Sequence, residues 1–337
     1  MVTLDENNTF QEWAELFLIY KRNKVSNGFF KSLRSAIAHA NDFLGMSPLT
    51  EITPHQVDEV LFSEKLFNYR NHKPLSRKSI KNIRDVISNI YSFAFENNPQ
   101  LAIRLYNPAK GRKLPSEASV TTRDAISVMW QRELISNTGH PMYIPVMIFM
   151  LCGLRRGELI PLKWTDIDFE TQLLSINKTV IEKGNTFVIK SGKAKTKTSI
   201  RKIPIPMLLL SALKASLPYA TSEFICPNPN TGGIFTPSSW GKSWKDYLDH
   251  LNKCYLNKQN KASLFCFTPQ ILRHTYATIL FNAGVDVLSA AKFLGHSNPE
   301  TTMKIYTHLQ KEKVSGAVNL YNVYVEDILS TSCMKAG

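Results

Sequence analysis

The last third of the chain places four polar side chains in a short span. Gln270 and Arg273 come first, His296 follows, and Tyr306 comes after the histidine, while Arg155 lies far upstream. Guanidiniums bind phosphate oxygens, imidazoles orient or transfer protons, and a phenol can act as a nucleophile. Each residue alone has an ordinary structural interpretation. Their order and spacing together indicate a site that cuts a phosphodiester bond through a tyrosine.

Arg155 follows a predicted helix break at Gly153 and begins the next helix. The free N–H groups and the positive dipole end of a helix start favour phosphate binding, and a guanidinium adds a bidentate fork. Glu158 lies three residues on, shares the same face and is predicted to hold that fork in place. The alternative is an ordinary surface Arg–Glu pair.

Gln270 and Arg273 are predicted to share one face of a helix that is capped by Thr268. Arg273 would reach a phosphate oxygen while Gln270 makes a hydrogen bond beside it. The neighbouring His274 points elsewhere on such a helix and is interpreted as a structural hydrogen-bonding residue.

Tyr306 needs a cationic environment to act as a nucleophile, because the pKa of a free tyrosine is about 10. The two arginines and His296, which follows a predicted turn at Gly295, are expected to supply it. The alternative for Tyr306 is an ordinary half-buried tyrosine.

A basic segment lies between the predicted strands of the second half. From Lys183 to Lys202 there are seven bases and no acid. A mobile lysine here is a plausible proton donor to a leaving 5′-oxygen, and the remaining bases would contact the DNA backbone. The candidates in this segment are Lys193, Lys195, Lys197 and Arg201.

The composition favours a polyanionic partner. The 337 residues carry 41 basic and 27 acidic side chains, a net charge of +14, and each phosphate that such a protein neutralises releases condensed counterions. A basic enzyme or a ribosome-associated protein is the alternative. We find neither a membrane span nor a signal peptide, so we expect a cytoplasmic protein. The five cysteines lack zinc-like spacing and are expected to be thiols.

The first part of the chain is predicted to be all-helical. Apolar residues recur at three- and four-residue steps over 11–20, 29–44 and 76–95, and Thr53 with Pro54 opens another helix. Nine bases against two acids lie between Lys73 and Lys113, a one-sided charge that favours contact with a DNA backbone over a merely solvated face. The contact candidates are Arg77, Lys78, Lys81 and Arg84.

The second part is predicted to be mixed. Helices are expected over 122–137 and 143–152, strands over 173–181, 186–189 and 200–205, with a tight turn at Gly184–Asn185, and further helices over 268–283 and 299–306. The fold class is therefore mainly α with a small antiparallel β-sheet. The domains are expected at 1–110 (helical, DNA-binding) and 122–337 (catalytic), joined by a linker over 111–121 rich in turn-forming residues.

The ordered set of Arg155, a lysine near a β-turn, Gln270 with Arg273, His296 and Tyr306 resembles the tyrosine recombinase (phage integrase) family. The strings that carry the resemblance are CGLRRGELIPLKWTDID, KAKTKTSIRKIPIP, TPQILRHTYAT and FLGHSNPETTMKIYTH. The resemblance is strong over 120–310 and moderate over 8–110, where the helical segment is similar to the family's core-binding domain.

The resemblance implies a site-specific DNA recombinase, either an integrase of a mobile element or a host-type resolvase, with a separate role for each site residue. Tyr306 would attack the scissile phosphate and form a 3′-phosphotyrosine link, and Arg155 and Arg273 would clamp the non-bridging oxygens. Lys195 matches the lysine that protonates the leaving oxygen, with Lys193 and Lys197 as rivals. His296 would hydrogen-bond the phosphate. No metal or other cofactor is implied, since the bond energy stays in the phosphotyrosine.

Gln270 departs from the family pattern, which usually has histidine at this position. Glutamine can orient a group but cannot titrate near neutral pH, so activity is expected to be retained and slowed. A catalytically weakened DNA-binding protein of the same fold is one alternative, and a type IB topoisomerase-like activity is another.

By the same resemblance the partners are double-stranded DNA carrying a specific site, further copies of this chain that form a homotetramer on that DNA, and accessory DNA-bending proteins. The tail over 314–329 would dock on a neighbouring protomer; the alternative is a helix packed on its own domain.

Overall fold

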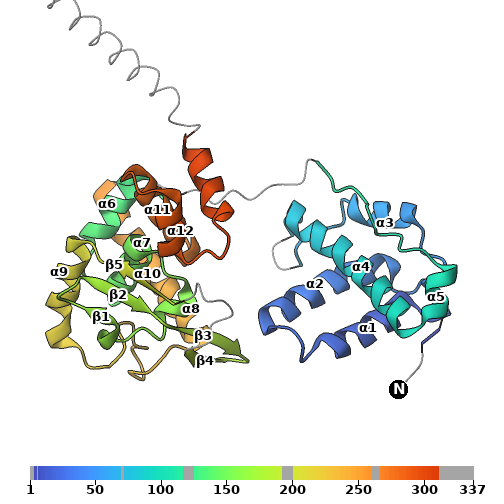
Figure 1. Cartoon of the computed structure of the whole chain (residues 1–337), viewed down its shortest axis with the longest axis horizontal. Coiled ribbons are helices and arrows are strands. Elements are labelled where there is room, and N and C mark those ends of the chain that lie inside the picture. Colours follow the sequence, from blue (N-terminus) through green and yellow to red (C-terminus); the bar gives the residue numbers. More distant parts are fainter. Residues whose placement is uncertain are drawn as a thin grey trace, which may run out of the picture. The chain divides into compact units, whose positions relative to one another are not determined.

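The computed structural model describes residues 4–5, 7–69, 72–116, 125–191, 200–259 and 266–310. The chain divides into two compact units, Met1–Thr122 and Arg123–Gly337, which are taken one at a time below (Figure 1). No helix in the described ranges is both long and apolar enough to cross a membrane.

The first unit is helical, as its apolar periodicity predicts. The expected cap at Thr53 is confirmed: Thr53 and Gln56 form a reciprocal capping box with Pro54 at the first helical position. Ser76 caps the longest described helix of the unit. The core lies between α2 and α4, with α1 packed against both. The helices are α1 (Phe10–Lys21), α2 (Asn27–Leu44), α3 (Pro54–Leu61), α4 (Arg77–Asn97) and α5 (Pro99–Arg104).

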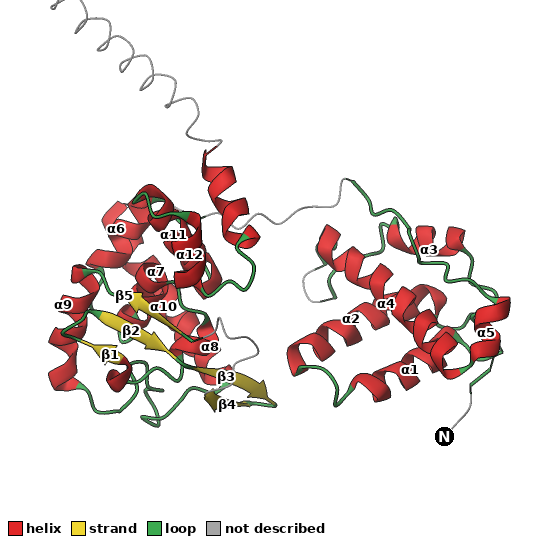
Figure 2. Ribbon diagram, in the orientation of Figure 1, coloured by secondary structure: helices red, strands yellow, loops and turns green. Residues whose placement is uncertain are grey.

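The second unit combines helices with two small antiparallel sheets, as Figure 2 shows, so the predicted fold class is confirmed. One sheet has the strand order β1-β2-β5 and the other is the hairpin β3-β4. The strands are β1 (Ile167–Asp168), β2 (Leu173–Ile176), β3 (Lys178–Lys183), β4 (Thr186–Ser191) and β5 (Arg201–Pro204). The helices are α6 (Val128–Ser136), α7 (Tyr143–Cys152), α8 (Arg156–Leu159), α9 (Met207–Ser216), α10 (Pro237–Gln259), α11 (Pro269–Asn282) and α12 (Val287–Leu294), with short 3₁₀ turns at Trp164–Asp166 and Leu217–Tyr219. A last helix covers residues 300–310.

The single strand predicted over 173–181 is wrong. The chain leaves the first sheet after Ile176 and joins the hairpin from Lys178, so one apolar run serves two sheets. Where the hairpin begins, the ammonium of Lys178 pairs with the buried Asp166 at 2.8 Å. The predicted turn at Gly184–Asn185 is confirmed, with Lys183 paired to Thr186 and a positive φ at Gly184.

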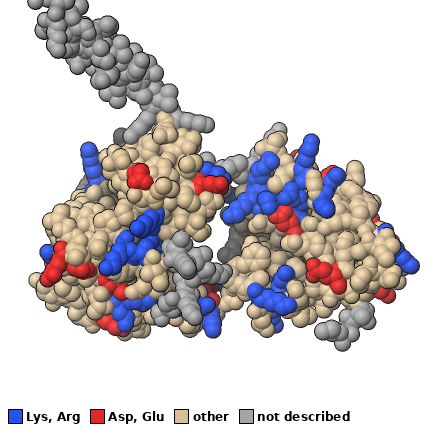
Figure 3. All heavy atoms as spheres, in the orientation of Figure 1, with Lys and Arg blue, Asp and Glu red and all other residues tan. Residues whose placement is uncertain are grey.

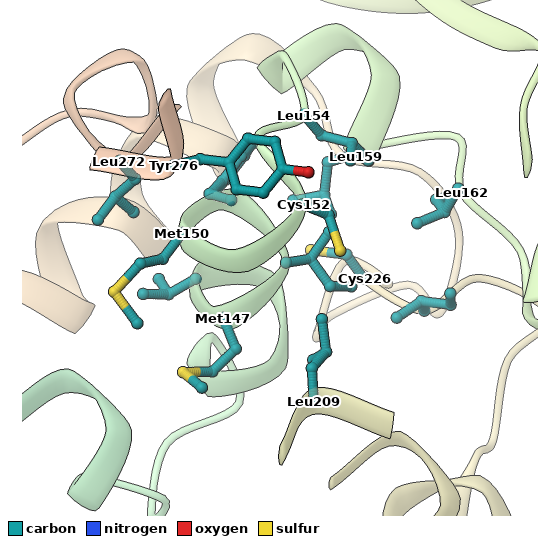
Figure 4. Close-up of a cluster of buried hydrophobic side chains, with 14 of the residues drawn as sticks. Met147, Met150, Cys152, Leu154, Leu159, Leu162, Leu209, Cys226, Leu272 and Tyr276 are labelled. Carbon is teal, nitrogen blue, oxygen red and sulfur yellow. The ribbon is translucent and has the colours of Figure 1, made fainter. Parts of the chain in front are cut away.

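The core of the second unit surrounds α7, which is buried along nearly its whole length. Helix α11 packs against it, and Figure 4 shows Tyr276 of α11 lying beside Cys152. Gly153 ends α7 in the left-handed conformation, and a Cβ there would lie 2.2 Å from the Tyr276 ring. Only glycine fits both conditions, so the chain can turn sharply just before Arg155.

Candidate active site

Arg155 is the N-cap of α8 and makes a reciprocal arrangement with Glu158. The backbone N–H of Arg155 donates to Glu158 Oε2 and its Nη1 donates to Oε1, both at 2.9 Å. The pairing predicted from the three-residue spacing is thus present. The side chain of Arg155 remains 44% exposed, so its guanidinium is accessible to a ligand.

Arg273 lies on α11, whose predicted cap at Thr268 is present. Only 3% of this residue is exposed. Its Nη1 donates to the carbonyl of Gly153 at 2.7 Å, and its Nη2 donates to the carbonyl of Leu294. Burial, followed by the nearby charge of Arg155, lowers the pKa of Arg273 to about 9.

The C-terminal end of α12 brings three arginines together. Three consecutive carbonyls accept from three different guanidiniums: Phe293 from Arg201, Leu294 from Arg273, and Gly295 from Arg155. The last carbonyls of a helix lack partners within the helix and lie at its negative dipole end, so cations stabilise them. The two arginines predicted to bind phosphate are therefore held in place before any ligand arrives.

His296 directly follows this helix end. Gly295 is left-handed, and the backbone N–H of His296 returns to the carbonyl of Ala291, which fixes the histidine relative to α12. Its Nδ1 shares a 2.8 Å hydrogen bond with the buried Thr302. Burial, followed by the charges of Arg273 and Arg155, lowers the pKa of His296 to about 4. The free protein therefore carries a neutral imidazole at neutral pH.

This neutral histidine has a consequence for stability at low pH. The pKa of His296 in the folded protein lies below the ordinary value of 6.5. Between about pH 6.5 and 4, this histidine is therefore protonated in the unfolded chain and neutral in the folded protein. Stability should therefore fall as pH falls through this window. We expect His296→Gln to reduce that fall, by a few degrees of Tm, on the order of 2–4 °C. Thermal melting from pH 7 to 4 measures it.

The matched control is His55→Gln, because the His55 side chain is 82% exposed. Equal pH slopes of Tm for the wild type and His296→Gln would contradict a neutral, buried His296.

A small cavity of about 50 Å³ joins several of these residues. Gln270 and Arg273 contribute from α11, and His296 contributes from the turn after α12. His274, interpreted from the sequence as structural, also lines it. The full lining is Gln270, Arg273, His274, Ala277, Leu294, His296, Thr301 and Ile305.

Tyr306 directly follows Ile305, which lines this cavity, but Tyr306 itself is not part of the lining. The residue is 5% exposed, packs edge-on against Phe281 with ring centroids 5.0 Å apart, and its hydroxyl has no hydrogen-bond partner in the described part of the chain. Burial, with the charge of Asp286, raises its pKa to about 12. The expected stabilisation of phenolate by surrounding cations is therefore wrong for this state.

Arg201 also differs from expectation. It was predicted on a DNA-contacting surface, but it is 6% exposed and its guanidinium is bonded to Glu158 and Phe293. This burial could not be predicted from the sequence, because the segment before Arg201 carries several lysines and no acid. Lys193, Lys195 and Lys197 lie outside the described residues. Thr302, the partner of His296, was not identified from the sequence.

The basic residues of α4 fall into two groups. Lys78 and Lys81 are exposed, and Lys81 pairs with Asp85. Arg77 and Arg84 are half-buried and donate to the carbonyls of Pro115 and Arg112, so they hold part of the expected linker against the helical unit. Figure 3 shows basic side chains gathered on this unit where α4 begins.

A metal site is not apparent: the described residues contain no group of three or more His, Cys, Asp or Glu side chains placed to hold a metal ion. The described cysteines, Cys152, Cys226, Cys254 and Cys266, are free.

Comparison with known proteins places these features in a family. A sequence model of the phage integrase family matches residues 133–313. The tyrosine recombinase XerC-like protein of Caldanaerobacter subterraneus subsp. tengcongensis is 31% identical over 280 residues, covering 77% of this chain and 69% of that protein. The ICEBs1 integrase of Bacillus subtilis is 26% identical over 290 residues, covering 82% and 72%.

Solved structures share the fold. The Tn1549 transposon integrase in complex with transposon right end DNA aligns with a TM-score of 0.72 at 20% identity, covering 91% of this chain and 100% of that one. A lambda integrase dimer bound to a COC′ core site aligns with a TM-score of 0.58 at 15% identity, covering 89% and 77%. From the family match and the sequence relatives, we conclude that the chain belongs to the phage integrase family of tyrosine recombinases.

Proposed function

We propose that this site-specific DNA recombinase cleaves and rejoins DNA strands through a 3′-phosphotyrosine link at Tyr306. The observation that carries the proposal is the convergence of Arg155, Arg273 and His296 at the C-terminal end of α12. With Arg201 and Glu158 included, the cluster holds three positive charges and one negative charge. Such an excess of positive charge matches a phosphodiester that gains negative charge in its transition state.

The proposed roles follow from accessibility. Arg155, half exposed, and Arg273, at the cavity wall, would each donate to a non-bridging oxygen. His296 is fixed by Thr302 and would bind the same phosphate through its other ring nitrogen. A phosphate would raise the pKa of His296 again, since an anion favours the charged imidazole.

Strand release needs a proton for the leaving 5′-oxygen. The phosphorus–oxygen bond to that oxygen breaks as the bond to the Tyr306 oxygen forms, and the phenol proton leaves to solvent. We propose Lys195 as the donor, with Lys193 and Lys197 as alternatives. These lysines belong to the segment 192–199, which connects β4 to β5 and is followed closely by the buried Arg201. The 5′-hydroxyl of a second strand would then attack the phosphotyrosine and restore a phosphodiester.

The proposed partner is double-stranded DNA that carries a specific recombination site. The Tn1549 and lambda integrase structures contain DNA, and a lambda integrase tetramer has been solved on a Holliday junction. By analogy we propose a homotetramer on DNA, with accessory DNA-bending proteins at some sites. The helical unit would contact the DNA backbone through Lys78 and Lys81, and through Arg77 and Arg84 where their N–H groups remain available. The tail over 314–329, proposed to dock on a neighbour, lies outside the described residues.

The direct test is covalent capture on a nicked duplex built from the ends of the DNA element that carries the gene. The nick lets a short 5′-hydroxyl fragment diffuse away, so the covalent adduct accumulates. An adduct on a denaturing gel supports the proposal. Retarded DNA mobility without an adduct would favour a DNA-binding protein, and relaxation of supercoiled DNA without site preference would favour topoisomerase-like activity.

Gln270 provides a second, graded test. It is exposed at the rim of the cavity, and its amide cannot exchange a proton near neutral pH. We expect Gln270→His to raise the cleavage rate, by about 10²-fold, and to make that rate depend on pH near the pKa of the new imidazole. Single-turnover adduct formation from pH 5.5 to 8.5 measures both effects.

A useful control is Gln270→Asn, which keeps an amide. If Gln270→His and Gln270→Asn react equally fast with the same pH profile, position 270 does not take part in proton transfer.

A further inference from the structure

Arg201 is buried at the start of β5, where its backbone pairs with Ile176 of β2. All three nitrogens of its guanidinium donate hydrogen bonds. Nη1 and Nη2 donate to Glu158 Oε1 and Oε2 at 3.1 and 2.9 Å, and Nε donates to the carbonyl of Phe293 at 2.7 Å. A guanidinium held bidentately on one side and by a helix end on the other cannot turn outward without breaking all three bonds.

Glu158 connects this buried arginine to the exposed one. Each of its oxygens accepts from Arg201 and also from Arg155, so a single carboxylate bridges the two residues. Burial alone would raise the pKa of Glu158, but the hydrogen bond and the charge of Arg201 outweigh it and hold the pKa at about 2. The bridge therefore stays ionised across the whole working range of pH.

The other side of Arg201 supports the turn that carries His296. A Cβ at Gly295 would lie 2.8 Å from Nη1 and 3.0 Å from Cζ of Arg201, so the backbone of this turn rests directly on the guanidinium. Gly295 also has a φ of +62°. Glycine is thus required here both by conformation and by the approach of Arg201.

We infer that Arg201 is a positioning residue for strand cleavage. It holds Arg155 through Glu158, and it holds the Gly295–His296 turn through the carbonyl of Phe293. It acts without touching DNA, and it belongs to the strand that follows the segment containing Lys195. This inference rests on the proposed function.

Two variants separate this role from DNA contact. Arg201→Met removes the charge and the hydrogen bonds, whereas Arg201→Lys keeps the charge but loses the bidentate fork. At saturating DNA we expect the cleavage rate to fall by about 10–10²-fold for Arg201→Lys and further for Arg201→Met. The DNA Kd and its salt dependence should not change, because a lost phosphate contact would reduce the salt slope by about 1. The matched control is Arg132→Met, which makes the same chemical change at an exposed arginine on α6, outside the basic segment, and should leave the rate and the Kd unchanged.

The pH profile gives a readout that a general loss of structure would not move. Without Arg201 the pKa of Glu158 should rise, because burial then dominates. The rate of adduct formation by Arg201→Met should therefore fall at acidic pH, because Glu158 becomes protonated there and releases Arg155. The wild type should show no such fall from Glu158 above pH 5.

The outcomes are distinguishable. A wild type without adduct overturns the proposed function itself. A reactive wild type with Arg201→Lys at the same rate, or with a weakened Kd and a shallower salt slope, overturns the positioning role. If Arg201→Met fails to fold, Arg201→Lys and the wild type decide it. In the wild type, DNA binding should leave the Nε–H NMR signal of Arg201 unchanged and move that of Arg155; the reverse pattern would contradict the inference.

Discussion

Tyr306→Phe is expected to abolish covalent DNA capture while leaving DNA affinity and folding intact. Loss of a nucleophile lowers the rate of a covalent enzyme by about 10⁴-fold or more. Phenylalanine keeps the edge-on packing against Phe281, and the hydroxyl it lacks has no hydrogen-bond partner in the described residues. Removing an unpartnered buried hydroxyl should leave Tm unchanged or slightly higher. Adduct yield, gel mobility shift and thermal melting measure the three quantities.

Tyr247→Phe is the matched control. Tyr247 is fully buried on α10, and its hydroxyl also has no hydrogen-bond partner among the described residues. The same chemical change should there leave the adduct yield at the wild-type level. An adduct that persists in Tyr306→Phe would show that another side chain attacks the phosphate, and the proposed mechanism would be rejected.

The burial of Tyr306 carries a further meaning for the reaction. A hydroxyl whose pKa is raised to about 12, and which has no hydrogen-bond partner among the described residues, is not poised to attack. The described arrangement therefore holds the proposed phosphate-binding residues in place, whereas the proposed nucleophile is buried. Helix 300–310 carries both Tyr306 and Thr302, the partner of His296. A shift of this helix on DNA would change the position of the nucleophile and the hydrogen bonding of the histidine together.

Local signals in the sequence predicted the elements well. The cap at Thr53, the turn at Gly184–Asn185 and the helix break at Gly153 depend on residues within one turn of each other, and all three appear in the structure. The division of the 173–181 run into two sheets was not predicted, because alternating apolar residues look the same whichever sheet they join. Strand partners are set by contacts distant in sequence.

The candidate site shows the same limit. The Arg155–Glu158 pair was predicted because it spans three residues, and Arg273 was placed correctly on a helix face. Arg201 was misassigned because its partner Glu158 lies 43 residues away. A basic residue in a lysine-rich segment is interpreted as exposed unless its distant acidic partner is known. The three-arginine arrangement at the end of α12 likewise joins segments that only the fold brings together.

Arg273→Lys is expected to lower the cleavage rate by about 10²–10³-fold at saturating DNA. The guanidinium of Arg273 spans two carbonyls, those of Gly153 and Leu294, from a buried position beside the cavity. A lysine has one nitrogen and cannot satisfy two diverging acceptors while also facing a phosphate. The loss should appear in the single-turnover rate rather than in Kd, because a buried residue adds little to the backbone contacts that determine affinity.

Arg132→Lys, an exposed arginine on α6, is the control and should react like the wild type. The cleavage rates of Arg155→Lys and Arg273→Lys show how much each arginine contributes to the reaction. Arg155 is held through Glu158 and is open to solvent, so a lysine there can still reach a phosphate, and we expect a smaller loss than for Arg273→Lys. Equal losses would mean that the exposed arginine is as strictly positioned as the buried one. A rate for Arg273→Lys within tenfold of the wild type would instead place the transition-state contact elsewhere, and would leave Arg273 as a residue that only joins α11 to the ends of α7 and α12.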